Sequence, residues 1–210
     1  RIKLGSGIIL LAQRNPLVLA KELAGIDVLS QGRLLVGVGV GYVPGEFEAL
    51  GIPYGERGAR TSEHIEAMRA LWTQDKPVFN GKFTSFSGIQ SKPSPVQTPH
   101  PPIIIGGMSP PAYRRAVRHG SGWYGFNQSL EAAAESIAGL AAAAKEIERP
   151  AGLGPLSVFI TPRGTVDGDT IKRFEDLGVE RLILLPKGRG GPTERAVQFI
   201  EETAERLGLG

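Results

Sequence analysis

Cysteine is absent from this 210-residue chain. A chain without cysteine has no disulfide bonds, no thiolate ligands for a metal and no cysteine nucleophile. The three histidines, His64, His100 and His119, do not have the spacing of a zinc site. We therefore predict a protein with neither a disulfide framework nor a bound metal.

Long apolar runs and concentrated charge are also missing. No run approaches the roughly 18 residues that span a bilayer, and the first residues show no signal-peptide pattern. The formal net charge is +3, and the basic residues are scattered along the chain. A nucleic-acid-binding protein would gather them in a stripe or block. We expect a cytoplasmic protein that binds neither membranes nor nucleic acids.

Short apolar runs alternate with amphipathic segments along the whole chain. A hydrophobic content of 41% is enough for a sizeable core, and we predict one domain over residues 1–210. Strands are expected at residues 2–10, 34–40, 102–106, 122–126, 156–161 and 181–186, and helices at 17–29, 47–50, 61–72, 112–118, 129–147, 169–177 and 193–207. This alternation predicts an α/β fold with six parallel strands.

One segment departs from the alternation. Asn80-Gly81 lies between Val78-Phe79 and Phe83, which predicts a β-hairpin with a tight turn. Strand–helix units continue on both sides of it, so we interpret it as an insertion and not as a domain boundary.

The apolar run at residues 102–106 ends in two glycines. Gly106 and Gly107 permit a sharp turn, Ser109 is a typical helix cap, and Pro110 and Pro111 suit a first helical turn. Backbone amides are then expected to converge in front of the helix and to bind an anion such as phosphate. A turn shaped only by packing fits these residues equally well.

Alternating glycines mark a second strand end. Gly37, Gly39 and Gly41 leave one face of the strand without side chains, against which a flat ligand or a helix would fit equally well. The segment is not a dinucleotide-binding fingerprint, because Tyr42 holds the place of the third glycine. Glu46 follows, either as an acid/base group at the end of a strand or as a helix residue in the first turn.

The remaining polar residues receive simpler interpretations. His64 and His119 lie on predicted helices, where we expect them at the surface or in an interface. Glu56 and Arg60 are expected to form an ion pair or a cap. His100 precedes a strand, on the side opposite to the expected site.

Taken in order, the motifs resemble the luciferase-like monooxygenase family, and within it the oxidoreductases that depend on the deazaflavin coenzyme F420. The match runs in order from Arg1 to Trp123 and continues loosely beyond. Its motifs are LGSG at 4–7, RNP at 14–16, KELA at 21–24, DVLSQGRL at 27–34, GVGVG at 37–41, ERGAR at 56–60, ALW at 70–72, PPIIIGG at 101–107 and GW at 122–123.

The resemblance implies a TIM (β/α)8-type barrel with a flavin or F420 at its C-terminal mouth. Here the barrel is expected to be incomplete, because the family's first two βα units have no counterpart in the chain. We therefore expect either an N-terminally truncated barrel or a reduced one whose open edges are covered by a partner chain. Family members are often dimers, so a homodimer is predicted.

The resemblance also implies site residues. Gly7 and Ile8 correspond to a bulge, often with a non-prolyl cis peptide, that supports the cofactor ring. The other residues implied to contact the cofactor are Gly39, Val40, Gly41 and Gly45 along its edge, and Gly106, Gly107, Met108 and Ser109 at its phosphate. Tyr42 stands where some members carry a catalytic glutamate. Catalytic residues are otherwise unassigned, with Tyr42 and Glu46 as the candidates.

The implied activity is hydride transfer between F420, or alternatively FMN, and a small organic substrate. A different class also fits, namely a non-catalytic or degenerate flavin- or F420-binding protein with a reduced barrel. A sugar-phosphate enzyme on an ordinary barrel would be suggested by the phosphate-binding turn alone.

Overall fold

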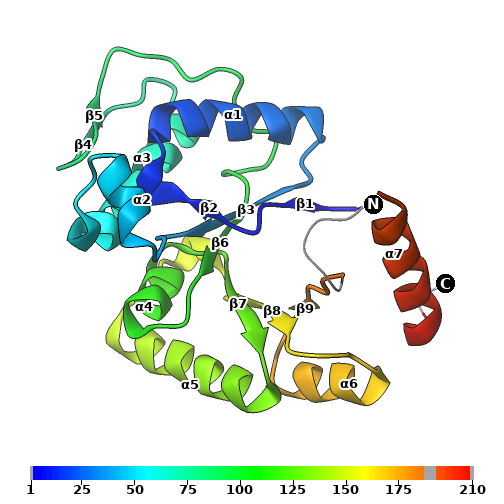
Figure 1. Cartoon of the computed structure of the whole chain (residues 1–210). Coiled ribbons are helices and arrows are strands. Elements are labelled where there is room, and N and C mark those ends of the chain that lie inside the picture. The colour runs from blue at the N-terminus through cyan, green and yellow to red at the C-terminus, as the bar shows by residue number, and fades with distance from the viewer. Residues whose placement is uncertain (1, 187–192, 209–210) are drawn as a thin grey trace.

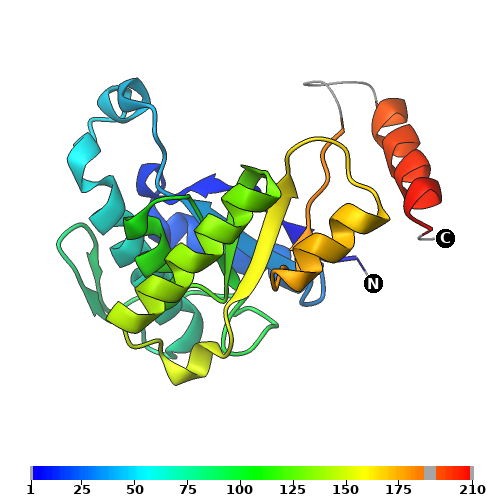
Figure 2. The ribbon, with the colours of Figure 1, turned by 90° about the horizontal axis from the view of Figure 1, so that it is seen from below.

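The parallel sheet of this protein curls into a half-barrel with helices on its outer side (Figures 1 and 2). The computed structural model describes residues 2–186 and 193–208. The strands are β1 (Leu4–Gly5), β2 (Ile9–Leu10), β3 (Leu34–Gly39), β6 (Ile103–Gly106), β7 (Gly122–Gln128), β8 (Ser157–Pro162) and β9 (Arg181–Leu182). The helices are α1 (Pro16–Leu29), α2 (Pro44–Ala49), α3 (Arg57–Thr73), α4 (Pro110–His119), α5 (Leu130–Glu146), α6 (Gly168–Asp176) and α7 (Thr193–Leu207).

The sheet order is β1-β3-β6-β7-β8-β9, and β2 also pairs with β3. Because β1 and β2 are two pieces of one interrupted strand, the sheet has six strand positions, and all their pairings are parallel. The predicted α/β fold, an incomplete TIM-type barrel of six parallel strands with a hairpin insertion, is confirmed. The last strand is shorter than expected, since β9 covers only two of the residues predicted at 181–186.

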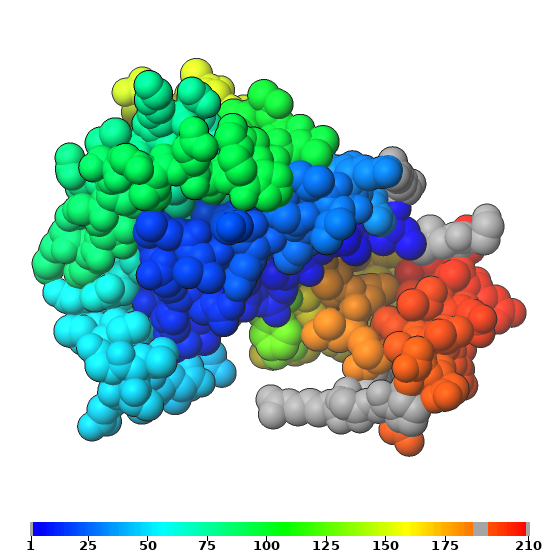
Figure 3. Space-filling view, turned by 90° about the horizontal axis from the view of Figure 1, so that it is seen from above, coloured from blue at the N-terminus to red at the C-terminus, as the bar shows by residue number. Residues whose placement is uncertain are grey.

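The core lies between the sheet and its helices. The helices of the first half contribute Leu19, Leu23, Met68 and Leu71, and the strands contribute Val36, Ile103, Ile105, Trp123 and Ile160. In the face shown in Figure 3, α1 (blue) and the segment between β5 and β6 (green) cover this core. Within the described residues, no helix is both long and apolar enough to cross a membrane.

Helix α1 shows how local sequence sets an element boundary. Asn15 caps it by accepting hydrogen bonds from the amides of Leu17 (2.9 Å) and Val18 (3.3 Å), with Pro16 as the first helical residue. At the other end of the helix, buried Asp27 accepts hydrogen bonds from Val96, Gln97 and the Gln97 side chain. This carboxylate joins α1 to the segment that leads into β6.

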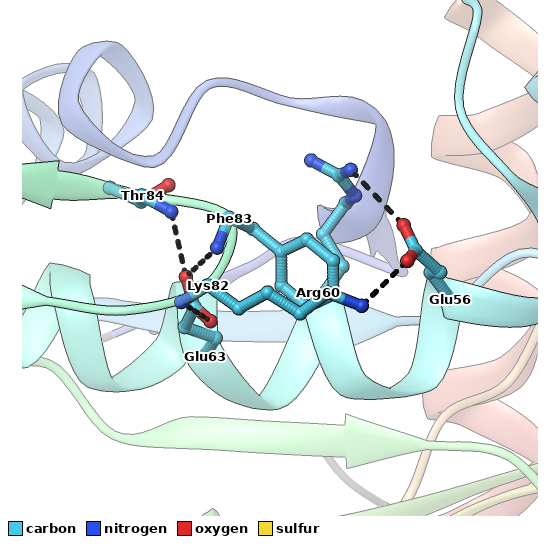
Figure 4. Close-up of polar contacts among 6 residues, drawn as sticks. All are labelled: Glu56, Arg60, Glu63, Lys82, Phe83 and Thr84. Atoms are coloured by element: carbon cyan, nitrogen blue, oxygen red, sulfur yellow. Dashed lines mark hydrogen bonds and ion pairs between the residues drawn. The ribbon is translucent and has the colours of Figure 1, made fainter.

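The predicted hairpin is confirmed and consists of β4 (Phe79–Asn80) and β5 (Ser85–Phe86). The turn covers residues 81–84, and the amides of Lys82, Phe83 and Thr84 donate to the Glu63 carboxylate of α3 at 2.7–2.8 Å (Figure 4). The amides of this turn therefore find their acceptor on a helix instead of on the opposite strand. The predicted Glu56–Arg60 ion pair is confirmed at 3.7 Å, and Glu56 also binds Lys82 at 2.7 Å.

Replacing Glu63 should loosen this turn. In Glu63→Gln one carboxylate oxygen becomes an amide donor, and each hydrogen bond to a charged group is worth about 1.5–3 kcal/mol. We expect tryptic cleavage after Lys82 to become about tenfold faster or more, because local opening limits proteolysis. Glu66→Gln, on the same helix, is the control. Equal cleavage rates in the two variants would contradict the role of Glu63.

His64 and His119, expected at the surface or in an interface, are both buried within the chain. His64 is buried, with Nδ1 3.2 Å from the carbonyl oxygen of Leu11, and its burial lowers its pKa. His119 is buried near Glu66, with Nδ1 3.8 Å from Oε1. Burial, and then the charges of Arg69, Arg118 and Arg115, lower the pKa of His119 to about 4. Both histidines sit on helix faces that pack inward.

The buried His119 predicts a loss of stability in acid. In the unfolded chain it takes up a proton near its ordinary pKa of 6.5, and in the folded chain only near 4. The free energy of unfolding should therefore fall between about pH 6.5 and pH 4, by about 2–3 kcal/mol at pH 4.5. Urea unfolding at pH 7 and 4.5 measures this fall. His119→Asn should show a smaller fall, and an unchanged fall would contradict the assignment.

Candidate functional site

Three of the predicted site segments lie side by side at the carboxyl edge of the sheet. Strand β2 pairs with β3 through Ile9 and Val38, and β3 pairs with β6 through Val38 and Ile105. Parallel strands place their carboxyl ends at one edge, where the following loops build binding sites. The segment 7–8, the end of β3 and the end of β6 therefore form one corner.

At Gly37 and Gly39 the face of β3 without side chains is filled by residues 6–8, whereas Phe47 of helix α2 packs against Gly41, just beyond the strand. A Cβ atom on Gly106 would lie 2.6 Å from Cδ1 of Ile8, and one on Gly39 would overlap the same atom. A Cβ atom on Gly37 would overlap the carbonyl oxygen of Ser6. The glycines thus leave room for the preceding strand segment, residues 6–8. The sequence did not suggest that this segment packs there.

Ser6 fastens this segment to β3. Its hydroxyl donates to the carbonyl oxygen of Gly37 and accepts from the Gly37 amide, both at 2.9 Å. The peptide bond between Gly7 and Ile8 is cis, as the resemblance implied. A Cβ atom on Gly7 would meet no atom within 4 Å, so the backbone there faces open space.

That open space is a mostly apolar pocket of about 290 Å³ on the inner side of the half-barrel. Besides the segment 5–8, its lining includes Gly37, Ile104, Tyr124 and Phe159. The volume is at the lower end of the range for small-molecule sites.

The turn after β6 is shaped for close backbone approach. Gly107 has a φ of +121°, and a Cβ atom there would lie 2.9 Å from the Cβ of Ala112. The indole Nε1 of Trp123 donates to the Gly107 carbonyl oxygen at 2.7 Å. No described residue accepts a hydrogen bond from the amides of Met108 or Ser109. These two amides are available to an anion.

The structure provides fewer donors in this turn than the sequence suggested. Pro110 and Pro111 have no N–H, and the amides of Ala112 and Tyr113 both donate to the backbone oxygen of Ser109. Ser109 is the N-cap residue of α4, as predicted, but its side chain makes no capping hydrogen bond. Its hydroxyl is left free to contact a ligand.

The loop after β3 brings in Gln13, a residue that sequence reasoning missed. Its Nε2 donates to Oε2 of Glu46 at 3.1 Å and lies 3.6 Å from where a Cβ of Gly41 would be. Glu46 is in the first turn of α2, which also contains Gly45. Gln13 ends the short 3-10 helix (Leu11–Gln13) that follows β2, so the rule that sites form after parallel strands would have pointed to it.

Exposed apolar side chains surround the same edge. Tyr42 follows β3, Met108 follows β6, Phe126 lies in the last part of β7, and Leu185 follows β9, and each is more than half exposed. Large apolar groups left in water at the ends of neighbouring strands indicate a binding surface. We refer to these four residues as the apolar rim.

Comparison with known proteins identifies the family. Residues 1–177 match the family model of the luciferase-like monooxygenases. The chain belongs to this family. An uncharacterized protein of Mycobacterium tuberculosis is 31% identical over 208 residues, which cover 99% of this chain and 71% of that protein. The FMNH(2)-dependent dimethylsulfone monooxygenase of Pseudomonas putida is 40% identical over 136 residues, which cover 61% of this chain and 37% of that enzyme.

Solved structures of the luciferase-like fold are similar as well. The monooxygenase RslO1 from Streptomyces bottropensis has a TM-score of 0.66 and 28% identity, covering 96% of this chain and 58% of that one. An F420-dependent secondary alcohol dehydrogenase, solved with an F420–acetone adduct, has a TM-score of 0.72 and 17% identity. The match covers 88% of this chain and 73% of that one. The second likeness concerns the fold alone. The chain thus spans little more than half the length of RslO1.

The fit between residues 6–8 and β3 can be tested by adding one methyl group. In Gly37→Ala the new Cβ would overlap backbone, which moves less readily than a side-chain end. We expect a loss of about 2–3 kcal/mol in the free energy of unfolding, measured in urea. Gly45→Ala, where nothing lies within 4 Å, is the matched control. Equal stability of the two variants would contradict the close approach.

Proposed function

We propose that this chain forms the cofactor-binding part of an oxidoreductase that transfers a hydride between F420, or FMN, and a small organic substrate. The observation that carries the proposal is the corner where Gly7 and Ile8 lie against Gly106. It provides a backbone surface that faces open space, next to a turn with two free amides. A flat ring with a phosphate at the end of a short chain matches both features.

The residues present fit such a cofactor. The ring would lie on Gly7 and Ile8 over the apolar pocket, and its phosphate would accept from the amides of Met108 and Ser109 and from the Ser109 hydroxyl. Val40 and Gly41 would follow its edge. The bound cofactor supplies the hydride chemistry, and the protein contributes orientation and the exclusion of water.

The apolar rim supports an apolar or weakly polar substrate. Met108, Phe126 and Leu185 would cover the reacting face and keep water away from it. Tyr42 and Glu46 remain the proposed groups for holding or moving a proton, and Gln13 would orient the Glu46 carboxylate. The homodimer expected from the sequence stays a prediction.

One observation favours a second candidate, a flavin- or F420-binding protein without turnover. The Tyr42 side chain is 84% exposed, and the Glu46 carboxylate is engaged by Gln13. Neither group is therefore held against the pocket beside Gly7. Transfer of a hydride from bound reduced cofactor to any substrate would exclude this second candidate.

Gly7→Leu tests the proposed position of the ring. The added side chain would enter open space, so stability should change little, while cofactor affinity should fall about tenfold or more because the pocket is filled. F420 fluorescence quenching and FMN absorbance measure binding to the full-length chain. Gly152→Leu, also in open space but outside the lining of the pocket, should bind as the wild type does. Binding of neither cofactor to the wild type would contradict the proposed function.

A further inference from the structure

A pair of hydroxyl groups, from Tyr124 and Thr161, lies at the edge of the inner pocket. Oη of Tyr124, on β7, and Oγ1 of Thr161, on β8, are 2.7 Å apart. Tyr124 lines the same pocket as Gly7 and Ile8. Thr161 is only 5% exposed and lines a second cavity at the carboxyl edge, and Leu185 contributes to both cavities. The hydroxyl pair thus lies between the two cavities.

The two side chains point into the half-barrel because their neighbours along the strands point out of it. Trp123 and Ile160 are buried in the core between the sheet and its helices. Successive side chains of a strand alternate between the two faces of the sheet. Tyr124 and Thr161 therefore face the inner side, which carries the pocket.

Strand register places Tyr124 beside the corner of the site. Tyr124 pairs with Gly106, and a Cβ atom on Gly106 would lie 2.6 Å from Cδ1 of Ile8. Tyr124 is therefore one strand away from the contact between Ile8 and β6, and neighbouring strands are about 5 Å apart. On β8 it pairs with Phe159, whereas its hydroxyl meets Thr161, two residues further along that strand. The phenol thus leans toward the carboxyl edge.

The other polar side chains of this pocket are engaged or remote. Among the described lining residues they are Lys3, Ser6 and Arg181. The Ser6 hydroxyl donates its O–H to the Gly37 carbonyl oxygen. Lys3 directly precedes β1 and Arg181 begins β9, so both stand at the amino ends of strands, away from the carboxyl edge. Within this lining, Tyr124 is the polar side chain available to a ligand at the carboxyl edge.

The hydroxyl pair has one O–H group to spare. Each hydroxyl offers one O–H donor and two lone pairs, and a single hydrogen bond between them uses one of the two donors. In the described part of the chain, neither hydroxyl makes a second hydrogen bond. Because Thr161 is buried and Tyr124 is half-buried, the spare O–H is more accessible on Tyr124, with Thr161 donating to it. A donor without an acceptor in a mostly apolar pocket provides a place for a ligand oxygen.

We propose that the Tyr124 hydroxyl binds the oxygen atom of the substrate and that Thr161 holds this hydroxyl in position. The inference rests on the proposed function and specifies its substrate class, a small and mostly apolar ketone or the corresponding alcohol. The spare O–H donates to a carbonyl oxygen, and the free lone pairs accept from an alcohol hydroxyl. The pair therefore suits the compound both before and after hydride transfer.

Tyr124 occupies a place that Tyr42 and Glu46 do not. Those two groups are not held against the pocket beside Gly7, whereas Tyr124 lines it. A hydrogen bond to a carbonyl oxygen stabilises the negative charge that develops there when the carbon atom accepts a hydride. Thr161 would strengthen that bond, because hydrogen bonds in a chain polarise one another.

The test compares two ligands of the same shape, cyclohexanone and methylenecyclohexane, in which a CH2 group replaces the carbonyl oxygen. NMR titration of the full-length chain, saturated with the oxidised cofactor that it binds, measures both Kd values without turnover. We expect Tyr124→Phe to weaken cyclohexanone binding about three- to tenfold, because one hydrogen bond is lost. The Kd of methylenecyclohexane should stay at the wild-type value, since the aromatic ring is kept.

Tyr113→Phe is the matched control, because the Tyr113 hydroxyl donates to Ser136 between helices α4 and α5, at 3.2 Å. It should keep the wild-type ratio of the two Kd values. Thr161→Val should lose part of the preference for the ketone, and Thr161→Ser, which keeps the hydroxyl, should retain it.

An unchanged Kd ratio in Tyr124→Phe, or an equal loss of both ligands, would overturn the inference and leave the proposed function intact, because cofactor binding is measured separately. A cofactor-loaded wild type that binds neither ligand would do the same. A wild type that binds neither F420 nor FMN would overturn both.

Discussion

The site depends on the close approach between residues 6–8 and the glycines of β3 and β6. Any side chain at Gly37 would strike the Ser6 carbonyl oxygen, and side chains at Gly39 or Gly106 would meet Ile8. Because these positions are bare, the first strand can be interrupted and still lie flat on the sheet. Its backbone then forms part of the lining of the inner pocket.

The charges around this corner are distributed unevenly. The carboxylates of Glu56 and Glu63 bind the amides and the lysine of the hairpin, while the free amides of residues 108 and 109 stay open to an anion. The exposed apolar rim adds a second kind of surface at the same edge. A ligand with an anionic group joined to a flat, largely apolar ring would match both the free amides and the apolar rim.

Elements set by local rules could be predicted closely. The helix at residues 193–207 matches α7, and the cap at Asn15 lies where the Asn-Pro pair indicated, because capping involves neighbouring residues. Features set by distant partners were missed. The amides of the hairpin turn donate to Glu63, and His64 is buried because α3 packs against Leu11.

The sequence by itself determined the strand–helix alternation, the family and the glycine-rich strand ends, since each is recorded in adjacent residues or in motif order. Only the tertiary structure decided what fills the bare face of β3, which amides of the turn stay free, and that Gln13 contacts Glu46. These outcomes depend on side chains from segments far apart in the chain. The distances between these side chains are fixed only when the sheet has curled and the helices have packed against it.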